Sequence, residues 1–218
     1  MLGFKIRCSA LGPLMTDPKT KAEGILSKGA KTYIRQLVAE EIFGVCFSIS
    51  SKYMEKGIVC EQDSINLLNR VRGVSLQKNT ERRSNKWITG ECDLWDESRK
   101  HGHDIKTSWS LQTFPILPID CEDKNYYWQM QGYMDLWGAD SWSVDYVMVD
   151  TPDELIKYES RDLHIVSHIP EQMRITTWHI ERSQEDINKM HERVEAAEKY
   201  VREVVSEFDK LHKLQEIK

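Results

Sequence analysis

Two aspartates and a lysine within residues 93–106 have the types and spacing of a metal-assisted hydrolytic site. Asp93 is followed by ten residues and then by Asp104 and Lys106. Two carboxylates held close together repel each other unless a cation joins them. Their oxygens suit Mg²⁺ or Mn²⁺, with water and phosphate oxygens in the remaining positions. Beside such an ion, a lysine can orient an attacking water or stabilise the phosphorus, so the set suits phosphodiester hydrolysis.

A predicted hairpin would bring these side chains together. Residues 87–95 alternate between apolar and polar side chains, which predicts a strand, and residues 102–108 predict a second one. The polar link from Asp96 to His101 is short enough for a hairpin. We interpret His101 and His103, which flank the return of the hairpin, as surface residues, with use as a ligand as the alternative.

Alternation along the second strand places Asp104 and Lys106 on one face and Ile105 on the other. The neighbouring strand would add Asp93 to the same face, and His103 would point away from it. An isolated Asp-x-Lys triplet is common by chance and also fits a surface ion pair. The residues around the triplet must therefore decide between the two interpretations.

Composition limits the class of protein. The chain has 218 residues and a formal net charge of −5, with 40% hydrophobic and 30% charged residues. These values are ordinary for a soluble globular protein, and we expect one domain over residues 1–218. No apolar run approaches the ~20 residues of a membrane span, and residues 1–7 lack the order of a signal peptide. The five cysteines form no C-x-x-C pair, which favours a reducing, cytoplasmic compartment.

The periodicity of the chain predicts an α/β (α+β) fold: a central mixed β-sheet flanked by helices, followed by a long C-terminal helix over residues 183–218. Residues 1–27 look irregular, and residues 150–172 match no element. Gly138 follows one helical segment, and Ser183 with Asp186 resembles a capping box. The remaining predicted helices are 28–43, 61–72 and 125–137, and the further strands are 142–149 and 174–181.

Three further segments help to decide between these interpretations. They are Lys56-Gly57-Ile58-Val59-Cys60-Glu61, the pair Gln129 and Tyr133 on one helix face, and Ser9-Ala10-Leu11-Gly12. With Gly90-Glu91-Cys92-Asp93 and Asp104-Ile105-Lys106-Thr107-Ser108, they resemble the PD-(D/E)xK nuclease superfamily. The closest resemblance is to its RecB-like, lambda-exonuclease and YqaJ-type phage exonuclease branch, over residues 5–150. Taken singly, Glu61 also fits a first-turn acid favoured by the helix dipole, and Tyr133 also fits an apolar core stripe.

The resemblance implies a restriction-endonuclease-like core and a metal site. Asp93 and Asp104 would bind Mg²⁺ or Mn²⁺, and the Ile105 carbonyl and Glu61 would complete the shell. Asp104 stands where many members of the superfamily carry Glu. Its side chain is one methylene shorter, which would bring the ion closer to the strand. Glu91, two residues before Asp93, fits either an additional acid of the site or a solvent-facing residue.

The resemblance also implies an activity, a metal-dependent exonuclease of phage type acting on linear duplex DNA. Lys106 would position or activate the water, and Gln129 and Tyr133 would support the DNA end or the lysine. The product would carry a 3′ single-stranded tail for a partner annealing protein. Members of the lambda type form ring trimers, so a homo-oligomer is expected. The host would be a bacterial cell.

Charge is distributed unevenly along the chain. The stretch 70–86 contains one acid, Glu81, and six basic residues that we predict to contact DNA phosphates: Arg70, Arg72, Lys78, Arg82, Arg83 and Lys86. A solvated surface is the alternative interpretation. The heptad seam of the last helix predicts packing along its own domain, with self-association as the alternative.

Two rival functions remain open at this point. One is a structure-specific or restriction-like endonuclease, which would cut closed circular DNA, whereas an exonuclease would not. The other is a non-catalytic DNA-binding or interaction protein on the same fold, which would show no metal-dependent cleavage. The intact acid–acid–lysine set argues against the second rival, because adjacent charges without a partner are costly.

Overall fold

The segment 87–95, predicted as one strand, divides between two sheets. The computed structural model describes residues 5–47 and 51–212, and within these ranges the strands form a three-stranded and a four-stranded sheet. The strands are β1 (Ile6–Arg7), β2 (Arg83–Ser84), β3 (Ile88–Gly90), β4 (Leu94–Asp96), β5 (His101–Thr107), β6 (Ser141–Val147) and β7 (Ile175–Glu181). The chain leaves the first sheet after Gly90 and enters the second at Leu94.

Both sheets are mixed. In the first, of order β1-β3-β2, β1 runs parallel to β3 and β2 antiparallel to it. In the second, of order β4-β5-β6-β7, β5 and β6 are parallel, and the other two pairs are antiparallel. The predicted mixed α/β fold is therefore confirmed, and of the hairpin predicted from residues 87–95 and 102–108 the structure forms the antiparallel pair of β4 and β5. The strands of the predicted mixed sheet are divided between these two sheets.

Other parts of the chain contact the segment between β3 and β4. Gly90 lies so close to its neighbours that a Cβ there would meet Cys8 Sγ and a Tyr133 ring carbon at 2.8 Å. Asn79 binds the turn that follows: its main-chain N–H donates to the Asp93 carbonyl at 2.7 Å, and its side-chain amide to the Cys92 carbonyl at 3.1 Å. Cys92 is buried, as predicted, and burial raises the pKa of its thiol to about 12.

The helices begin and end where their capping residues predict. Ser27, Asp123 and Ser183 accept hydrogen bonds from main-chain N–H groups of the first turn, and Gly138 ends its helix with a φ of 64°. The α-helices are α1 (Leu11–Leu14), α2 (Lys28–Phe43), α3 (Lys52–Val59), α4 (Glu61–Arg72), α5 (Lys124–Trp137), α6 (Asp153–Ile156) and α7 (Gln184–Leu211). Short 3-10 helices cover Cys8–Ala10, Lys21–Glu23, Leu111–Thr113, Pro118–Cys121, Arg161–Leu163 and Glu171–Arg174.

The periodicity of the sequence does not reveal the shortest elements. Residues 1–27, predicted as irregular, contain β1 and α1, and the buried Ile6 of β1 pairs with Ile88. Two residues are too few to show a period, so only pairing with β3 defines this strand. The helix α3 was not predicted, and α6 lies in the unassigned segment 150–172.

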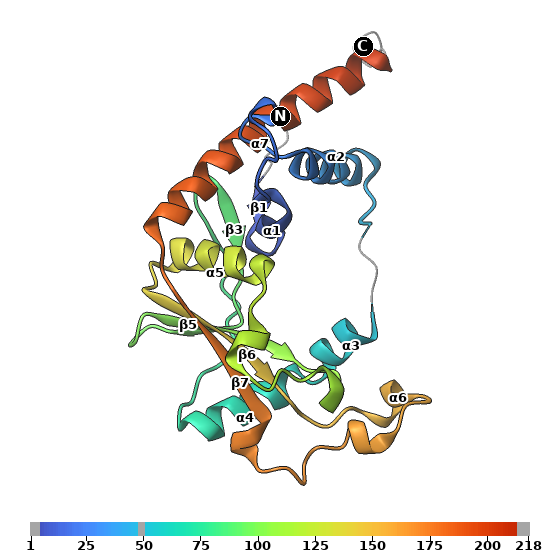
Figure 1. Ribbon diagram of the computed structural model, residues 1–218, viewed down its shortest axis with the longest axis vertical. Helices are drawn as coiled ribbons and strands as arrows, with labels where there is room; N and C mark the ends of the chain where they lie inside the picture. Colours follow the sequence, from blue (N-terminus) through green and yellow to red (C-terminus); the bar gives the residue numbers. More distant parts are fainter. Residues whose placement is uncertain (1–4, 48–50, 213–218) are drawn as a thin grey trace.

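The four-stranded sheet separates two groups of helices (Figure 1). On one face α5 packs against the sheet and lies between it and α1 and α7. On the other face α4 buries Ile65, Leu67 and Leu68, with Ile105 packed against them. Asp104 therefore faces α5 and Ile105 faces α4, as the predicted alternation requires.

The long helix α7 packs along the body of the molecule (Figure 1). The first five seam residues are buried: Ile187, Met190, Val194, Ala197 and Val201. The seam then leaves the core, and Leu211 is 78% exposed. Intramolecular packing is thus confirmed as far as Val201, self-association remains a prediction, and residues 213–218 of the predicted helix lie outside the described residues. None of the described helices is both long and apolar enough to span a membrane.

Candidate active site

The β4–β5 hairpin places two carboxylates side by side. Leu94 pairs with His103 in an antiparallel register, so Asp93 and Asp104 form the next opposing pair. The main-chain N–H of Ile105 donates a 2.7 Å hydrogen bond to Asp93 Oδ2. Asp104 is only 2% exposed. The fold thus brings these two aspartates together, as the sequence predicts.

Burial and charge act together on Asp93. Loss of solvent raises the pKa of its carboxyl, and the neighbouring Asp104 raises it further, to about 7. The Ile105 N–H and the Lys106 ammonium oppose this shift and only partly offset it. A proton or a cation bound at two buried, adjacent carboxylates reduces their electrostatic repulsion and so stabilises the folded protein. The site therefore has the electrostatic character of a cation site.

Lys106 lies on the same face of β5 as Asp104. Its Nζ is 2.7 Å from Asp104 Oδ2 and 4.3 Å from the ring centroid of Tyr126. Burial lowers the pKa of this lysine, but Asp104, Tyr126 and Asp93 together more than offset burial, and the net shift is upward. Lys106 is therefore an ammonium group at neutral pH. In this state it orients or stabilises an anion rather than removing a proton.

Gln129 and Tyr133 on α5 join the site through a chain of hydrogen bonds. Gln129 Nε2 lies 3.3 Å from Asp104 Oδ1 and 3.1 Å from Tyr133 Oη, and donates to both. Tyr133 Oη in turn donates to the Glu91 carbonyl at 2.9 Å. Gln129 thus contacts an acid of the site directly. Tyr133 is 5% exposed and acts through Gln129, so the arrangement makes it a positioning residue.

Glu61 lies close enough to Asp93 to act on it electrostatically, but it does not form one cluster with the two aspartates. It begins α4, adds to the negative potential that raises the Asp93 pKa, and forms an ion pair with Lys78. Within residues 5–47 and 51–212, no group of three or more His, Cys, Asp or Glu side chains is arranged to hold a metal. The donor set still fits Mg²⁺, which is often bound through one or two carboxylates with water and substrate phosphate completing the shell.

Lys56 supports the site from a position that periodicity alone did not identify. It is 1% exposed, and its Nζ donates to the carbonyls of Ser108, Trp109 and Val149 at 2.7, 3.0 and 3.0 Å. These carbonyls follow the adjacent ends of β5 and β6, so Lys56 ties α3 to both strands. Burial lowers its pKa to about 8. The Lys-Gly-x-x-x-Glu segment was the one sequence signal for this residue.

The six basic residues of the stretch 70–86 do not form one free cationic face. Each lies next to an acid in the described structure: the pairs are Arg70–Glu171, Arg72–Asp145, Lys78–Glu61, Arg82–Glu91, Arg83–Glu81 and Lys86–Glu195. Glu91 therefore lies at the surface in contact with Arg82. Arg72 binds an acid that is fully buried. The DNA-contacting role of the six residues remains a prediction.

The opposite face of the β5 strand carries a histidine cluster. His103, expected at the surface, is buried, and its Nδ1 lies 2.8 Å from Asp145 Oδ2. The surface interpretation is thus wrong for His103 because β6 places a buried carboxylate beside it. With His101 and His179 it lines a cavity of about 420 Å³. Burial and the neighbouring imidazoles lower the pKa of His101 to about 4.

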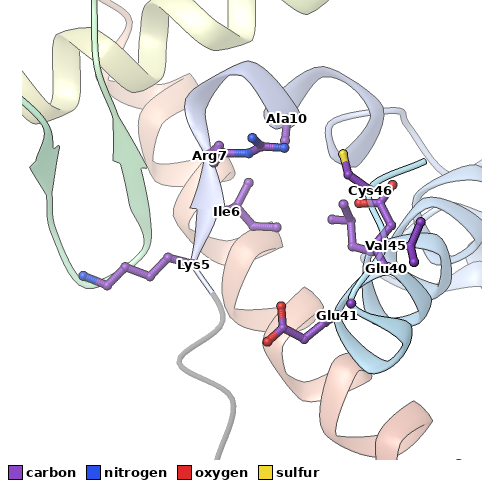
Figure 2. A pocket seen from close by; sticks show the side chains of 10 residues that line it. Lys5, Ile6, Arg7, Ala10, Glu40, Glu41, Val45 and Cys46 are labelled. Atoms are coloured by element: carbon purple, nitrogen blue, oxygen red, sulfur yellow. The ribbon is translucent and has the colours of Figure 1, made fainter. Parts of the chain in front are cut away.

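A second hollow, of about 510 Å³, lies between β1 and the end of α2 (Figure 2). Figure 2 shows Lys5 and Arg7 on one side and Glu40 and Cys46 on the other. Basic and acidic side chains face the same space, so no single ligand charge is favoured. The described lining residues include none of the candidate site residues.

Comparison with known proteins finds similar chains among the solved structures. No family model matches the chain, and no curated protein does. Among solved structures, the chain is similar to a phage-related exonuclease from Haemophilus somnus 129PT, with 40% sequence identity and a TM-score of 0.88. The match covers 94% of this chain and 96% of that chain.

A more distant likeness concerns the fold alone. An alkaline exonuclease (LHK-Exo) from Laribacter hongkongensis matches with a TM-score of 0.65 and 17% identity, over 96% of this chain and 94% of that one. The structure of LHK-Exo in complex with dAMP matches with a TM-score of 0.64 and 18% identity, over the same shares. The mixed sheets with flanking helices are thus common to these three structures.

Proposed function

Because the chain belongs to the family of phage-related exonucleases, we propose that it is a metal-dependent exonuclease acting on the ends of linear duplex DNA. The observation that carries the proposal is the cluster of Asp93, Asp104 and Lys106 on adjacent strands of one hairpin. The three residues match the order acid, acid and lysine of the PD-(D/E)xK superfamily, to which we assign the chain. The LHK-Exo complex with dAMP supports a deoxynucleotide as the ligand class of this fold.

The site would hold Mg²⁺ or Mn²⁺ between Asp93 and Asp104. The Ile105 carbonyl and Glu61 are the further proposed ligands. These two ligands rest on the resemblance, whereas burial and the neighbouring Asp104, which raise the pKa of Asp93, support a cation at this place. When bound, a divalent cation supplies Lewis-acid stabilisation of the charge that develops on the phosphate oxygens.

The side chains of the protein do the rest of the positioning. The Lys106 ammonium would orient the attacking water and stabilise the phosphate in the transition state. Gln129 would hold the orientation of Asp104, and Tyr133 would hold Gln129. We further propose a 3′-tailed product for an annealing protein and assembly into a homo-oligomer, since these properties follow from the lambda-type resemblance.

A comparison of two DNA forms tests the proposed activity. Purified protein is incubated with end-labelled linear duplex and with closed circular plasmid, each with Mg²⁺, Mn²⁺ or EDTA. Loss of the linear DNA alone, only in the presence of a cation, is the expected result. Cutting of the circle would indicate an endonuclease instead. No cleavage under any condition would favour a non-catalytic DNA-binding protein.

A further inference from the structure

Lys78 lies outside the acid–acid–lysine set, yet it forms an ion pair with Glu61 at the start of α4. We propose that Lys78 is an exchangeable counter-ion of the site. Without a divalent cation, its ammonium neutralises Glu61, and with the cation bound, it is released to bind a phosphate of the DNA. This inference rests on the proposed function, because it takes Glu61 as a ligand of the cation.

The backbone of Lys78 is fixed beside the start of β4, next to Asp93. After α4, the side chain of Asn69 binds both main-chain groups of Leu76, at 3.0 and 2.9 Å, and directs the chain back along the helix. Lys78 then pairs with Leu94 in an antiparallel bridge, and the N–H of Asn79 donates to the Asp93 carbonyl. Because its backbone is held in this way, Lys78 can change partner only by rotating its side chain.

The pair itself is open to exchange. The side chains of Lys78 and Glu61 are 44% and 29% exposed, and ion pairs this exposed are weak. Among the described residues, Lys78 is the one side chain that bonds or pairs with Glu61. Lys106 differs, since it is held between Asp104 and the Tyr126 ring. Of the two lysines, Lys78 is therefore the one free to leave its carboxylate.

Charge balance gives the direction of the exchange. When all three carboxyl groups of Glu61, Asp93 and Asp104 are ionised, they outnumber the two ammonium groups, which leaves one negative charge. A divalent cation changes this balance to one positive charge. The positive balance no longer requires the Lys78 ammonium at Glu61, and it attracts a phosphodiester. Cation binding and DNA binding are thereby coupled through one side chain.

The proposed exchange predicts that Lys78→Gln has opposite effects on cation binding and on DNA binding. The variant should bind a divalent cation more tightly than the wild type, by about threefold or more, because Glu61 is no longer occupied. Its binding to DNA should lose about one phosphate contact, which lowers the slope of log Kd against log salt concentration by about 0.9. That loss should appear with the cation and be absent in EDTA.

The experiment uses Ca²⁺, which prefers the same oxygen ligands as Mg²⁺. Calorimetry gives the affinity for Ca²⁺, and fluorescence anisotropy of a labelled duplex gives the salt slope in Ca²⁺ and in EDTA, with intact DNA verified on a gel. Lys52→Gln is the matched control, since it removes the lysine of another exposed Lys–Glu pair, which lies outside the stretch 70–86. Lys78→Arg should restore the wild-type salt slope in Ca²⁺.

The outcomes separate the inference from the proposed function. Tighter cation binding with a cation-dependent loss of slope supports the exchange. Unchanged or weaker cation binding by Lys78→Gln, or an equal loss of slope in EDTA, overturns it while leaving the nuclease intact. Failure of the wild type to bind any divalent cation would instead refute the proposed function and, with it, the exchange.

Discussion

The N–H of Ile105 donates a 2.7 Å hydrogen bond to Asp93 Oδ2, so the strand that carries Asp104 and Lys106 is bound directly to the first carboxylate of the site. This contact sets the spacing of the two acids through the main chain rather than through side-chain packing. It also leaves Asp93 buried next to a like charge, which raises its pKa. The first prediction follows from this unfavourable burial of a carboxylate next to a like charge.

Asp93→Asn should stabilise the metal-free protein at pH 8. The pKa of Asp93 is about 7 in the folded protein and near 3.8 as an unperturbed group. Between these values the folded protein binds more protons than the unfolded chain, so its stability falls as the pH rises from about 4 to about 7. The amide removes this loss, and we expect a gain on the order of 2 kcal/mol at pH 8.

Denaturant unfolding in EDTA at several pH values measures this effect. The difference between the variant and the wild type should disappear below about pH 4, where the wild-type carboxyl is protonated. A less stable Asp93→Asn protein at pH 8 would show that the two carboxylates do not repel each other as described.

A divalent cation should raise the unfolding temperature of the wild type. A ligand that binds only the folded state, at a concentration about 100 times its Kd, adds about 2.7 kcal/mol to stability. Asp104→Asn removes one carboxylate of the proposed site and should lose most of this gain. Asp153→Asn, which removes an exposed acid paired with Arg161, is the matched control and should keep it. Equal gains in all three proteins would place the cation elsewhere.

Much of the site was predictable because its residues are close in sequence or share an element. Asp93, Asp104 and Lys106 lie on one hairpin, where alternation and register alone determine which side chains meet. Gln129 and Tyr133 lie one helical turn apart and reach the hairpin from α5. The end of α5 followed from Gly138, and the start of α7 from Ser183.

The remaining features depend on contacts between distant segments, which no local pattern encodes. Ile6 forms a strand only because it pairs with Ile88. Arg72 looked like a surface cation, but its partner Asp145 lies 73 residues further along the chain. His103 is buried for the same reason. The break after Gly90 depends on Tyr133, which packs against the glycine backbone from another element.

Tyr133→Phe and Gln129→Leu should differ in their effects. Loss of the Tyr133 hydroxyl leaves the Glu91 carbonyl without its donor and should cost about 1 kcal/mol of stability. The rate of DNA cleavage should change only a few-fold, since Gln129 still contacts Asp104. Gln129→Leu removes that contact and should lower kcat by about tenfold or more with little change in KM. Steady-state kinetics measure the two rate losses, and thermal unfolding measures the loss of stability. A larger rate loss for Tyr133→Phe than for Gln129→Leu would contradict the assigned roles.

Arg72→Met should act on stability rather than on DNA binding. The guanidinium contacts Asp145, whose side chain is fully buried, and removing one partner of a buried ion pair costs about 3 kcal/mol. Lys86→Met breaks an exposed pair and should cost less than about 1 kcal/mol. Unfolding measurements and the salt dependence of DNA binding test this. A stable Arg72→Met protein with a reduced salt slope would make Arg72 a DNA contact instead.

The most direct test of the central claim is the single-turnover rate at which Lys106→Ala degrades end-labelled linear duplex with Mg²⁺. Lys199→Ala, at an exposed position on α7, is the control. Lys106→Ala should be slower than the wild type by about 100-fold or more, because the ammonium group of Lys106 stabilises charge in the transition state. Its affinity for the duplex should change only a few-fold. Wild-type rates for Lys106→Ala would contradict the assignment of Asp93, Asp104 and Lys106 as the active site.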